Sequence, residues 1–119
     1  MPASMRQFKA NVFQAMGHTT RVAILELLQA GELSVGQICE HVGIEQANAS
    51  QHLGVLRNKH LVTTRKEGNQ IFYSLRDPLI GDVLEVMRKL FLAHAQEALE
   101  MLREEQRMAE QGGLEHDAA

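Results

Sequence analysis

The sequence has one cysteine, Cys39, no tryptophan and few aromatic side chains. A single cysteine excludes a disulfide within the chain and a metal site built from several cysteines. The aromatic content of 4% argues against a surface on which single-stranded bases stack. Because a thiol sensor normally needs a second, resolving cysteine, Cys39 is interpreted as a small buried apolar residue. The alternative for Cys39 is a disulfide between two copies of the chain.

Long apolar runs and the signatures of catalysis are also missing. No apolar run approaches the roughly 18 residues that span a bilayer. The first ten residues, MPASMRQFKA, lack the apolar segment of a signal peptide, and we therefore expect a cytoplasmic protein. Neither a nucleophile spaced with its base nor a glycine-rich phosphate loop is present. We accordingly expect no enzymatic activity.

The net charge of −3 argues at first sight against a nucleic-acid partner, but the charges are unevenly distributed. Residues 44–76 carry five basic and two acidic side chains, whereas residues 77–119 carry four basic and ten acidic ones. Electrostatic interactions are screened over about 8 Å at physiological salt. A basic middle region can therefore attract nucleic acid although the far end of the chain is acidic.

The apolar residues recur mainly at helical spacing. With a hydrophobic content of 45%, the chain can bury one core, and we expect one domain over residues 1–110 and a disordered tail at 111–119. A hairpin is predicted around Glu67-Gly68-Asn69, with strands near 62–66 and 70–75. Spacing and capping residues predict helices over 8–16, from Thr19 or Thr20 to Gly31, from Ser34 to Gly43, over 46–59, and from Pro78 to about Met108.

This order of elements predicts a mainly α fold with a small β-hairpin, a winged helix-turn-helix. The helices joined by Gly43-Ile44-Glu45 form the helix-turn-helix, and the hairpin after them is the wing. The apolar stripe of the last helix is longer than so small a domain can cover, which predicts a homodimer through terminal helices. The alternative is that this helix folds back on its own core. The expected dimer interface comprises Val83, Met87, Leu90 and Phe91.

The segment NASQHLGVLR at 48–57 combines an apolar stripe with short uncharged polar residues on the opposite face. An α-helix fits the major groove of DNA, where Asn or Gln can make two hydrogen bonds to adenine. The candidate base contacts are Gln46, Asn48, Ser50 and Gln51, and the candidate phosphate contacts are Arg57, Lys59, Arg65 and Lys66. The plainer alternative is an ordinary solvated helix face.

Three segments together resemble the ArsR/SmtB family of bacterial winged-helix repressors: FQAMGHTTRVAILELL, ELSVGQICEHVGIEQANASQHLGVLRNKHLV and TTRKEGNQIFYSL. The most specific parts are the run from Ser50 to Leu53 and the Phe72-Tyr73 pair. Within this run, His52 matches a family position beside the recognition face, and the resemblance implies that it either bonds a phosphate or stabilises the fold. The resemblance implies a homodimer that binds an operator in double-stranded DNA and releases it when an inducer, often a metal ion, binds.

The chain also departs from that family. The family's Cys-Val-Cys metal motif falls at Ser34-Val35-Gly36, so a thiolate metal site of that type is absent. Thr19 stands where the family usually has proline, and Glu45 stands where a capping serine is common.

The last helix carries a second set of candidate metal ligands. Asp82 and Glu85 lie three residues apart, as do His94 and Glu97, so each pair shares one helical face. Antiparallel pairing of two such helices near residue 89 or 90 would bring the first pair of one copy to the second pair of the other, a donor set that suits zinc. The alternative is a solvated charged face.

The resemblance supports the zinc hypothesis only in part. Some family members bind zinc between their last helices through Asp, His, His and Glu. The segment His94-Ala95-Gln96-Glu97 matches the latter half of that set, whereas Leu84 stands where the first histidine would be.

These observations predict a sequence-specific DNA-binding repressor. Winged helices also serve as protein-interaction scaffolds, and the chain is acidic overall, so an interaction module is the alternative from another class. Within the DNA-binding class, the alternative is a constitutive binder that has no inducer.

Overall fold

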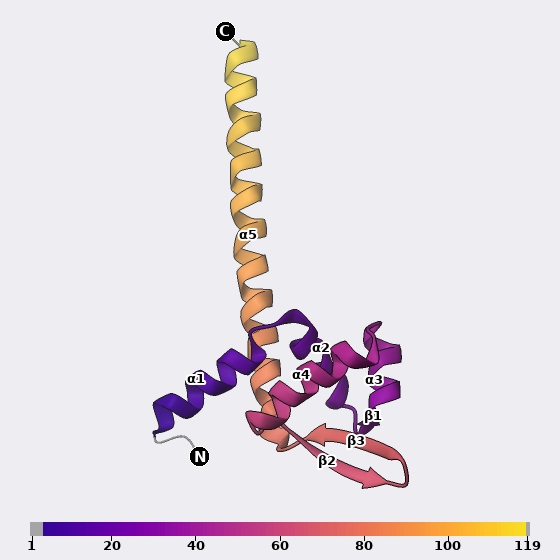
Figure 1. Cartoon of the computed structure of the whole chain (residues 1–119). Helices are drawn as coiled ribbons and strands as arrows, with labels where there is room; N and C mark the ends of the chain where they lie inside the picture. Colours follow the sequence, from indigo (N-terminus) through magenta and orange to yellow (C-terminus); the bar gives the residue numbers. More distant parts are fainter. Residues whose placement is uncertain (1–3, 119) are drawn as a thin grey trace. The chain divides into compact units, whose positions relative to one another are not determined.

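The computed structural model describes residues 4–118, and the side chains of residues 4–112 (Figure 1). The chain divides into two compact units, one ending at Leu84 and one beginning at Glu85. The division falls within the last helix. The single domain predicted over residues 1–110 stays a prediction. The elements are α1 (Met5–Met16), α2 (Thr19–Leu28), β1 (Leu33–Ser34), α3 (Val35–Val42), α4 (Gln46–Asn58), β2 (Val62–Glu67), β3 (Gln70–Leu75) and α5 (Pro78–Ala118).

The helix-turn-helix is formed by α3 and α4, as predicted. Ser34 caps α3 through a reciprocal pair of bonds: the Gln37 N–H donates to Ser34 Oγ at 3.2 Å, and the Ser34 N–H donates to Gln37 Oε1 at 3.0 Å. Gly43 ends α3 in the left-handed conformation, with φ of 76°. This conformation costs glycine little because glycine has no Cβ, and it turns the chain toward α4.

The start of α2 corrects one prediction. His18, and not Thr19 or Thr20, is the N-cap residue: the Thr20 N–H donates to His18 Nδ1 at 3.1 Å. A neutral imidazole keeps one unprotonated nitrogen, which accepts a hydrogen bond as the oxygen of a more usual cap would. The helix ends at Leu28, three residues before Gly31.

The wing is confirmed, and the structure adds a third strand to it. β2 and β3 pair antiparallel from Val62 opposite Leu75 to Glu67 opposite Gln70, around a turn at Gly68-Asn69. β1 pairs with the other edge of β3, which gives the strand order β1-β3-β2. At two residues, β1 is too short to show the alternation of apolar and polar residues that identifies a strand in a sequence.

The core lies among α2, α3, α4 and the base of the sheet. Six large apolar side chains are fully buried there, and each stabilises the fold by roughly 1.5–3 kcal/mol relative to an exposed position. They are Ile24, Leu25, Ile38, Leu53, Leu56 and Val62. Cys39 is half-buried beside this core, with a free thiol. Because Leu53 and Leu56 belong to α4, the core holds α4 at a fixed rotation about its axis.

The last helix is longer than predicted. The pattern predicts an end near Met108 and a disordered tail at 111–119, but α5 continues to Ala118, and Ala119 lies outside the described residues. An ion pair between Arg107 and Glu104, three residues apart, supports the helix in this region. Among residues 4–118, no helix is both long and apolar enough to cross a membrane.

Candidate nucleic-acid interface

Helix α4 has two unlike faces. Ala49, Leu53 and Leu56 are completely buried. Successive helical residues are roughly 100° apart, so Gln51, two positions from both Ala49 and Leu53, points away from the core. The side chains of all four candidate base contacts are exposed: Gln46, Asn48, Ser50 and Gln51. The structure therefore presents these four side chains together on the solvent side of one rigid helix.

His52 lies at the edge of that face and contacts the N-terminus of α2. Its ring is half-buried and packs on the His18 ring, with 4.4 Å between the ring centroids. Burial, together with the charges of His18 and Arg21, holds the pKa of His52 below its ordinary value. Arg21 is itself fixed, since it donates to the carbonyl oxygens of Ala15 and Gln14. These contacts favour a fold-stabilising role for His52 over a phosphate contact.

The candidate phosphate contacts differ in their exposure and in whether they form ion pairs within the chain. Arg57 and Lys66 are exposed and Lys59 is half-buried, and none of the three has an ion-pair partner within residues 4–112. The Arg65 side chain, in contrast, is bonded to the carboxylates of Glu32 and Glu67. Three of the four basic candidates are therefore available to an anion as they stand.

Arg76 is a basic residue that sequence reasoning did not single out. Its backbone N–H donates to the Leu61 carbonyl oxygen at 3.1 Å, which holds the end of the wing beside the end of α4. A polar hollow of about 380 Å³ is lined by Arg76 together with, among others, Arg57, His60, Thr63 and Thr64. Arg76 is among the five basic residues counted in 44–76, and that count was the signal available.

The predicted dimer residues are accessible. Val83, Leu90 and Phe91 are exposed, and Met87 is half-buried. Sequence reasoning missed a second apolar surface, on α1, where Met5, Phe8 and Phe13 are exposed. An apolar hollow of about 360 Å³ lies between α1 and the first turns of α5, lined among others by Phe8, Val12, Met16, Ile80 and Val83. Exposed apolar surface of this extent is typical of protein–protein contacts.

One copy of the chain does not assemble the predicted metal site. Within the described residues, no three His, Cys, Asp or Glu side chains are placed to hold a metal ion. Asp82, His94 and Glu97 are exposed, whereas both carboxylate oxygens of Glu85 accept bonds from Arg88, which lower the pKa of Glu85. The predicted donor set therefore requires a second copy, and Glu85 would have to exchange Arg88 for the metal.

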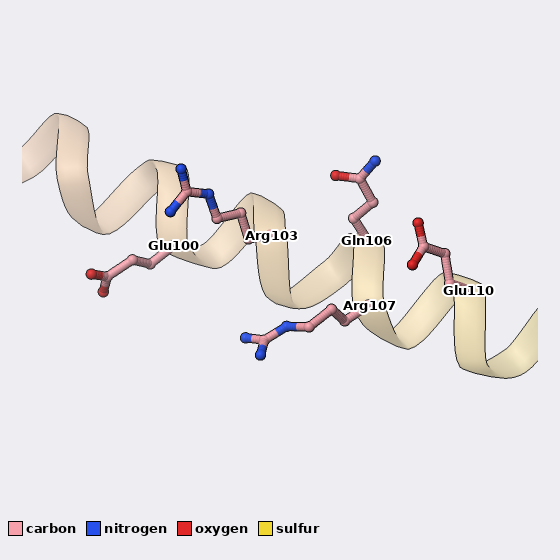
Figure 2. Close-up of a pocket in the computed structure, with 5 residues that line it drawn as sticks. All are labelled: Glu100, Arg103, Gln106, Arg107 and Glu110. Atoms are coloured by element: carbon pink, nitrogen blue, oxygen red, sulfur yellow. The ribbon is translucent and has the colours of Figure 1, made fainter.

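A further hollow, of about 550 Å³, lies along the distal part of α5. Its lining residues all come from this single helix: Glu100, Arg103, Gln106, Arg107 and Glu110. In Figure 2 these side chains extend outward from the ribbon, with no second element facing them. The hollow is therefore a charged helix surface and not an enclosed ligand site.

Comparison with known proteins identifies the family. Residues 18–64 match the model of the arsR family of bacterial regulatory proteins. Rv0081 of Mycobacterium tuberculosis, named as an uncharacterised HTH-type transcriptional regulator, is 42% identical over 85 residues, which cover 71% of this chain and 75% of the relative. The chain belongs to the arsR family. The resemblance to this family noted in the sequence, and the winged helix-turn-helix fold predicted from it, are thus confirmed.

Other comparisons agree with this arsR-family assignment. The crystal structure of Rv0081 matches with a TM-score of 0.74 and 36% identity, over 82% of this chain and 99% of that one. The biofilm growth-associated repressor of Xylella fastidiosa is 35% identical over 89 residues, or 75% of this chain and 78% of the relative. The solution structure of a homodimeric winged helix-turn-helix DNA-binding domain from Mycobacterium bovis matches with a TM-score of 0.74 and 26% identity, over 80% of this chain and 88% of that one.

Proposed function

We propose that this arsR-family chain is a homodimeric transcriptional repressor that binds a roughly palindromic operator. The observation that carries the proposal is the exposed polar face of α4, set opposite a face that is completely buried. A helix held in this way can enter the major groove without a change in the core. The repressor name of the Xylella relative and the homodimeric Mycobacterium bovis domain support the same assignment.

Different side chains contact the bases and the phosphates. Gln51, with Gln46, Asn48 and Ser50 beside it, reads base edges, because amide and hydroxyl groups match the donors and acceptors in the major groove. Arg57, Lys59 and Lys66 contact phosphates, which fix the register of the protein on the duplex but carry no sequence information. Two copies of α4 then read two half-sites about one helical turn of DNA apart.

The test is selection of bound duplexes from a random pool, followed by affinity measurements on the selected operator and on random DNA. Gln51→Ala should reduce the discrimination between the two DNAs by about 1–3 kcal/mol, because a base contact is lost. Gln106→Ala, which changes an exposed glutamine on the distal part of α5, is the matched control and should leave both affinities unchanged. Equal losses on both DNAs in Gln51→Ala would show that Gln51 does not read bases.

The same experiment separates the competing functions. A protein-interaction module would not bind double-stranded DNA. A DNA-binding protein would bind it with an affinity that falls steeply as the salt concentration rises, because the binding involves phosphate contacts. A reporter gene under the selected operator then gives the sign of regulation: the chain should lower its transcription. Higher transcription in the presence of the chain would make it an activator.

We also propose zinc as the inducer, through the pairs Asp82 with Glu85 and His94 with Glu97 across the dimer. An imidazole and three carboxylates form a donor set that zinc accepts, and bound zinc would crosslink the two last helices. Titration of the dimer with zinc should show binding that His94→Ala weakens, together with loss of DNA affinity. If the wild type binds zinc no more tightly than His94→Ala, or keeps its DNA, the last helix serves dimerisation only.

A further inference from the structure

The side chain of Arg65, on the wing, is half exposed and makes three hydrogen bonds to protein carboxylates. Nε and Nη2 donate to the two carboxylate oxygens of Glu32 at 3.1 and 2.5 Å, and Nη1 donates to Glu67 at 2.6 Å. One face of the guanidinium covers the Phe72 ring, with 4.8 Å from Cζ to the ring centroid. Both donor edges and one face of the cation are therefore occupied.

The two basic residues of the wing point in opposite directions. Side chains alternate between the faces of a strand, so consecutive Arg65 and Lys66 lie on opposite sides of the sheet. Lys66 shares its face with Val62, which is buried, and with Thr64 between them. Arg65 shares the other face with Thr63, whose hydroxyl is hydrogen-bonded to that of Ser74 across the hairpin. The two cations therefore lie in different surroundings, on opposite faces of the wing.

The bond from Arg65 to Glu32 connects strands that are not neighbours. Glu32 directly precedes β1, Arg65 lies in β2, and β3 runs between these strands. Phe72 is the residue of β3 that pairs with Arg65 on one side and with Ser34 on the other. The ion pair thus crosses over the central strand at Phe72 and ties the outer strand of the wing to the segment that leads into α3.

The charges around Arg65 do not favour a phosphate. One guanidinium and two carboxylates sum to a local charge of −1, which repels an anion. Exposed single ion pairs contribute little to stability, but a two-pronged Arg–carboxylate contact within a network is the recognised exception. A phosphate at Arg65 would have to compete with the carboxylates of Glu32 and Glu67 for the guanidinium.

We propose that the two-pronged ion pair between Arg65 and Glu32, called the strut below, fixes the orientation of the wing relative to the helix-turn-helix. Arg65 is then a positioning residue, and Lys66 makes the phosphate contact. The proposal rests on the DNA-binding function proposed above and changes the role that the sequence predicts for Arg65. Glu32 becomes part of the DNA-binding machinery although its own charge opposes DNA. The wing reaches the duplex through Lys66 at an angle that the strut maintains.

The test compares the salt dependence of operator affinity in the full-length dimer for four variants. Lys66→Ala should lower the salt slope by about one ion, as expected when one phosphate contact is lost. Arg65→Ala and Glu32→Gln should each weaken binding by about threefold to tenfold at a single salt concentration while leaving the slope unchanged. The double variant Arg65→Ala with Glu32→Gln should bind no more weakly than either single variant, because both changes remove the same strut.

Two results would overturn the strut. A salt slope lowered by one ion in Arg65→Ala, with binding restored by Arg65→Lys, would make Arg65 a phosphate contact, since lysine keeps the charge but cannot hold Glu32 through two bonds. Tighter binding by Glu32→Gln would show that Glu32 only masks a cation.

A measurement without DNA keeps the strut testable if the proposed function fails. NMR relaxation of the backbone amides in the free dimer should give lower order parameters for β2 in Arg65→Ala and in Glu32→Gln than in the wild type. Lys66→Ala is the matched control, because Lys66 takes part in no ion pair within the described residues. Unchanged order in both strut variants would refute the strut, whereas absence of duplex binding by the wild type would refute the DNA-binding function alone.

Discussion

Many apolar side chains are buried in the part of the chain that ends at Leu84, whereas those in most of the part that begins at Glu85 are exposed. Leu53 in the first part is completely buried, whereas Leu90 and Leu99 in the second are 69% and 47% exposed. From Arg88 to Gly112, every side chain is exposed. Residue type alone therefore does not decide burial: a leucine is buried only where other elements of the fold surround it.

The difference indicates where each part obtains its stability. The first part holds a core of its own, to which α2, α3, α4 and β2 contribute. A single helix in water is only marginally stable, since most helical stability comes from packing of an apolar face. We therefore expect the apolar residues of the second part to be covered by another surface, which a second copy of the chain would supply in a homodimer.

The largest effect is expected from truncating a leucine in the first part. Leu53→Ala should lower the free energy of unfolding by about 2–5 kcal/mol, because it leaves a cavity in the core. Leu99→Ala is the matched change in the second part. At low protein concentration it should alter the free energy of unfolding by no more than about 0.5 kcal/mol, as for other exposed positions. Urea unfolding of both variants, monitored by circular dichroism, measures the difference.

The cost of Leu99→Ala should depend on protein concentration. If the second part packs against another copy, the cost of Leu99→Ala should rise at concentrations where the dimer forms. A cost for Leu99→Ala as large as that for Leu53→Ala in the dilute monomer would mean that α5 packs on its own chain.

The next effect concerns the dimer. Leu90→Glu places a charge on the apolar face of α5, and a charge in a packed interface must be desolvated or the interface must open. We expect the dimer dissociation constant to rise at least about thirtyfold, equivalent to about 2 kcal/mol. Sedimentation equilibrium measures this change. A dimer of unchanged affinity would place the interface elsewhere, with α1 and its exposed Phe8 and Phe13 as the next surface to change.

A smaller effect is expected at the start of α3. Ser34→Ala removes the side-chain acceptor of the Gln37 N–H and should reduce the free energy of unfolding by about 1 kcal/mol. Ser34→Asp, which restores an acceptor, is the control and should recover most of the loss in chemical denaturation. No loss in Ser34→Ala would show that the capping bonds do not contribute to the stability of the first part.

The smallest effect is a dependence of stability on pH. The pKa of His52 in the folded chain is lowered from the ordinary value of 6.5, mainly by burial and then by the charges of His18 and Arg21. His52 therefore binds a proton more readily in the unfolded chain than in the folded one. The stability that neutral His52 contributes is fully present above about pH 6.5 and is lost as the pH falls toward the pKa of the folded chain. The free energy of unfolding should fall between pH 7.5 and 5.5, and by less in His52→Gln. Equal falls in both proteins would exclude His52 as the source.

Much of the first part could be predicted because local signals and tertiary packing agree there. The cap at Ser34, the glycine at position 43 and the helical spacing of Ala49, Leu53 and Leu56 all act within a few residues, and each is read directly from the sequence. The exposed face of α4 followed from the same spacing, since the residues opposite a buried stripe must face outward.

The features that were missed have three different causes. Glu32 and Arg65 are 33 residues apart and meet only because β3 lies between β1 and β2. The cap on α2 depends on the tautomer and rotamer of His18, which no spacing rule contains. The end of α5 could not be placed from the sequence because apolar spacing becomes sparse beyond Met108, while backbone hydrogen bonds can continue without it.

The central place of β3 divides the wing into two parts with different rates of opening. At Phe72 and Tyr73 the strand has partners on both sides, whereas from Gln70 toward the turn it has β2 alone. Separating two strands costs less free energy than separating three, so amide hydrogens near the turn should exchange with heavy water first and exchange should slow sharply at Phe72. The wing would then fray from its tip to a fixed stopping point. The tip would adapt its shape to a bound duplex while the three-stranded base keeps its position beside α4.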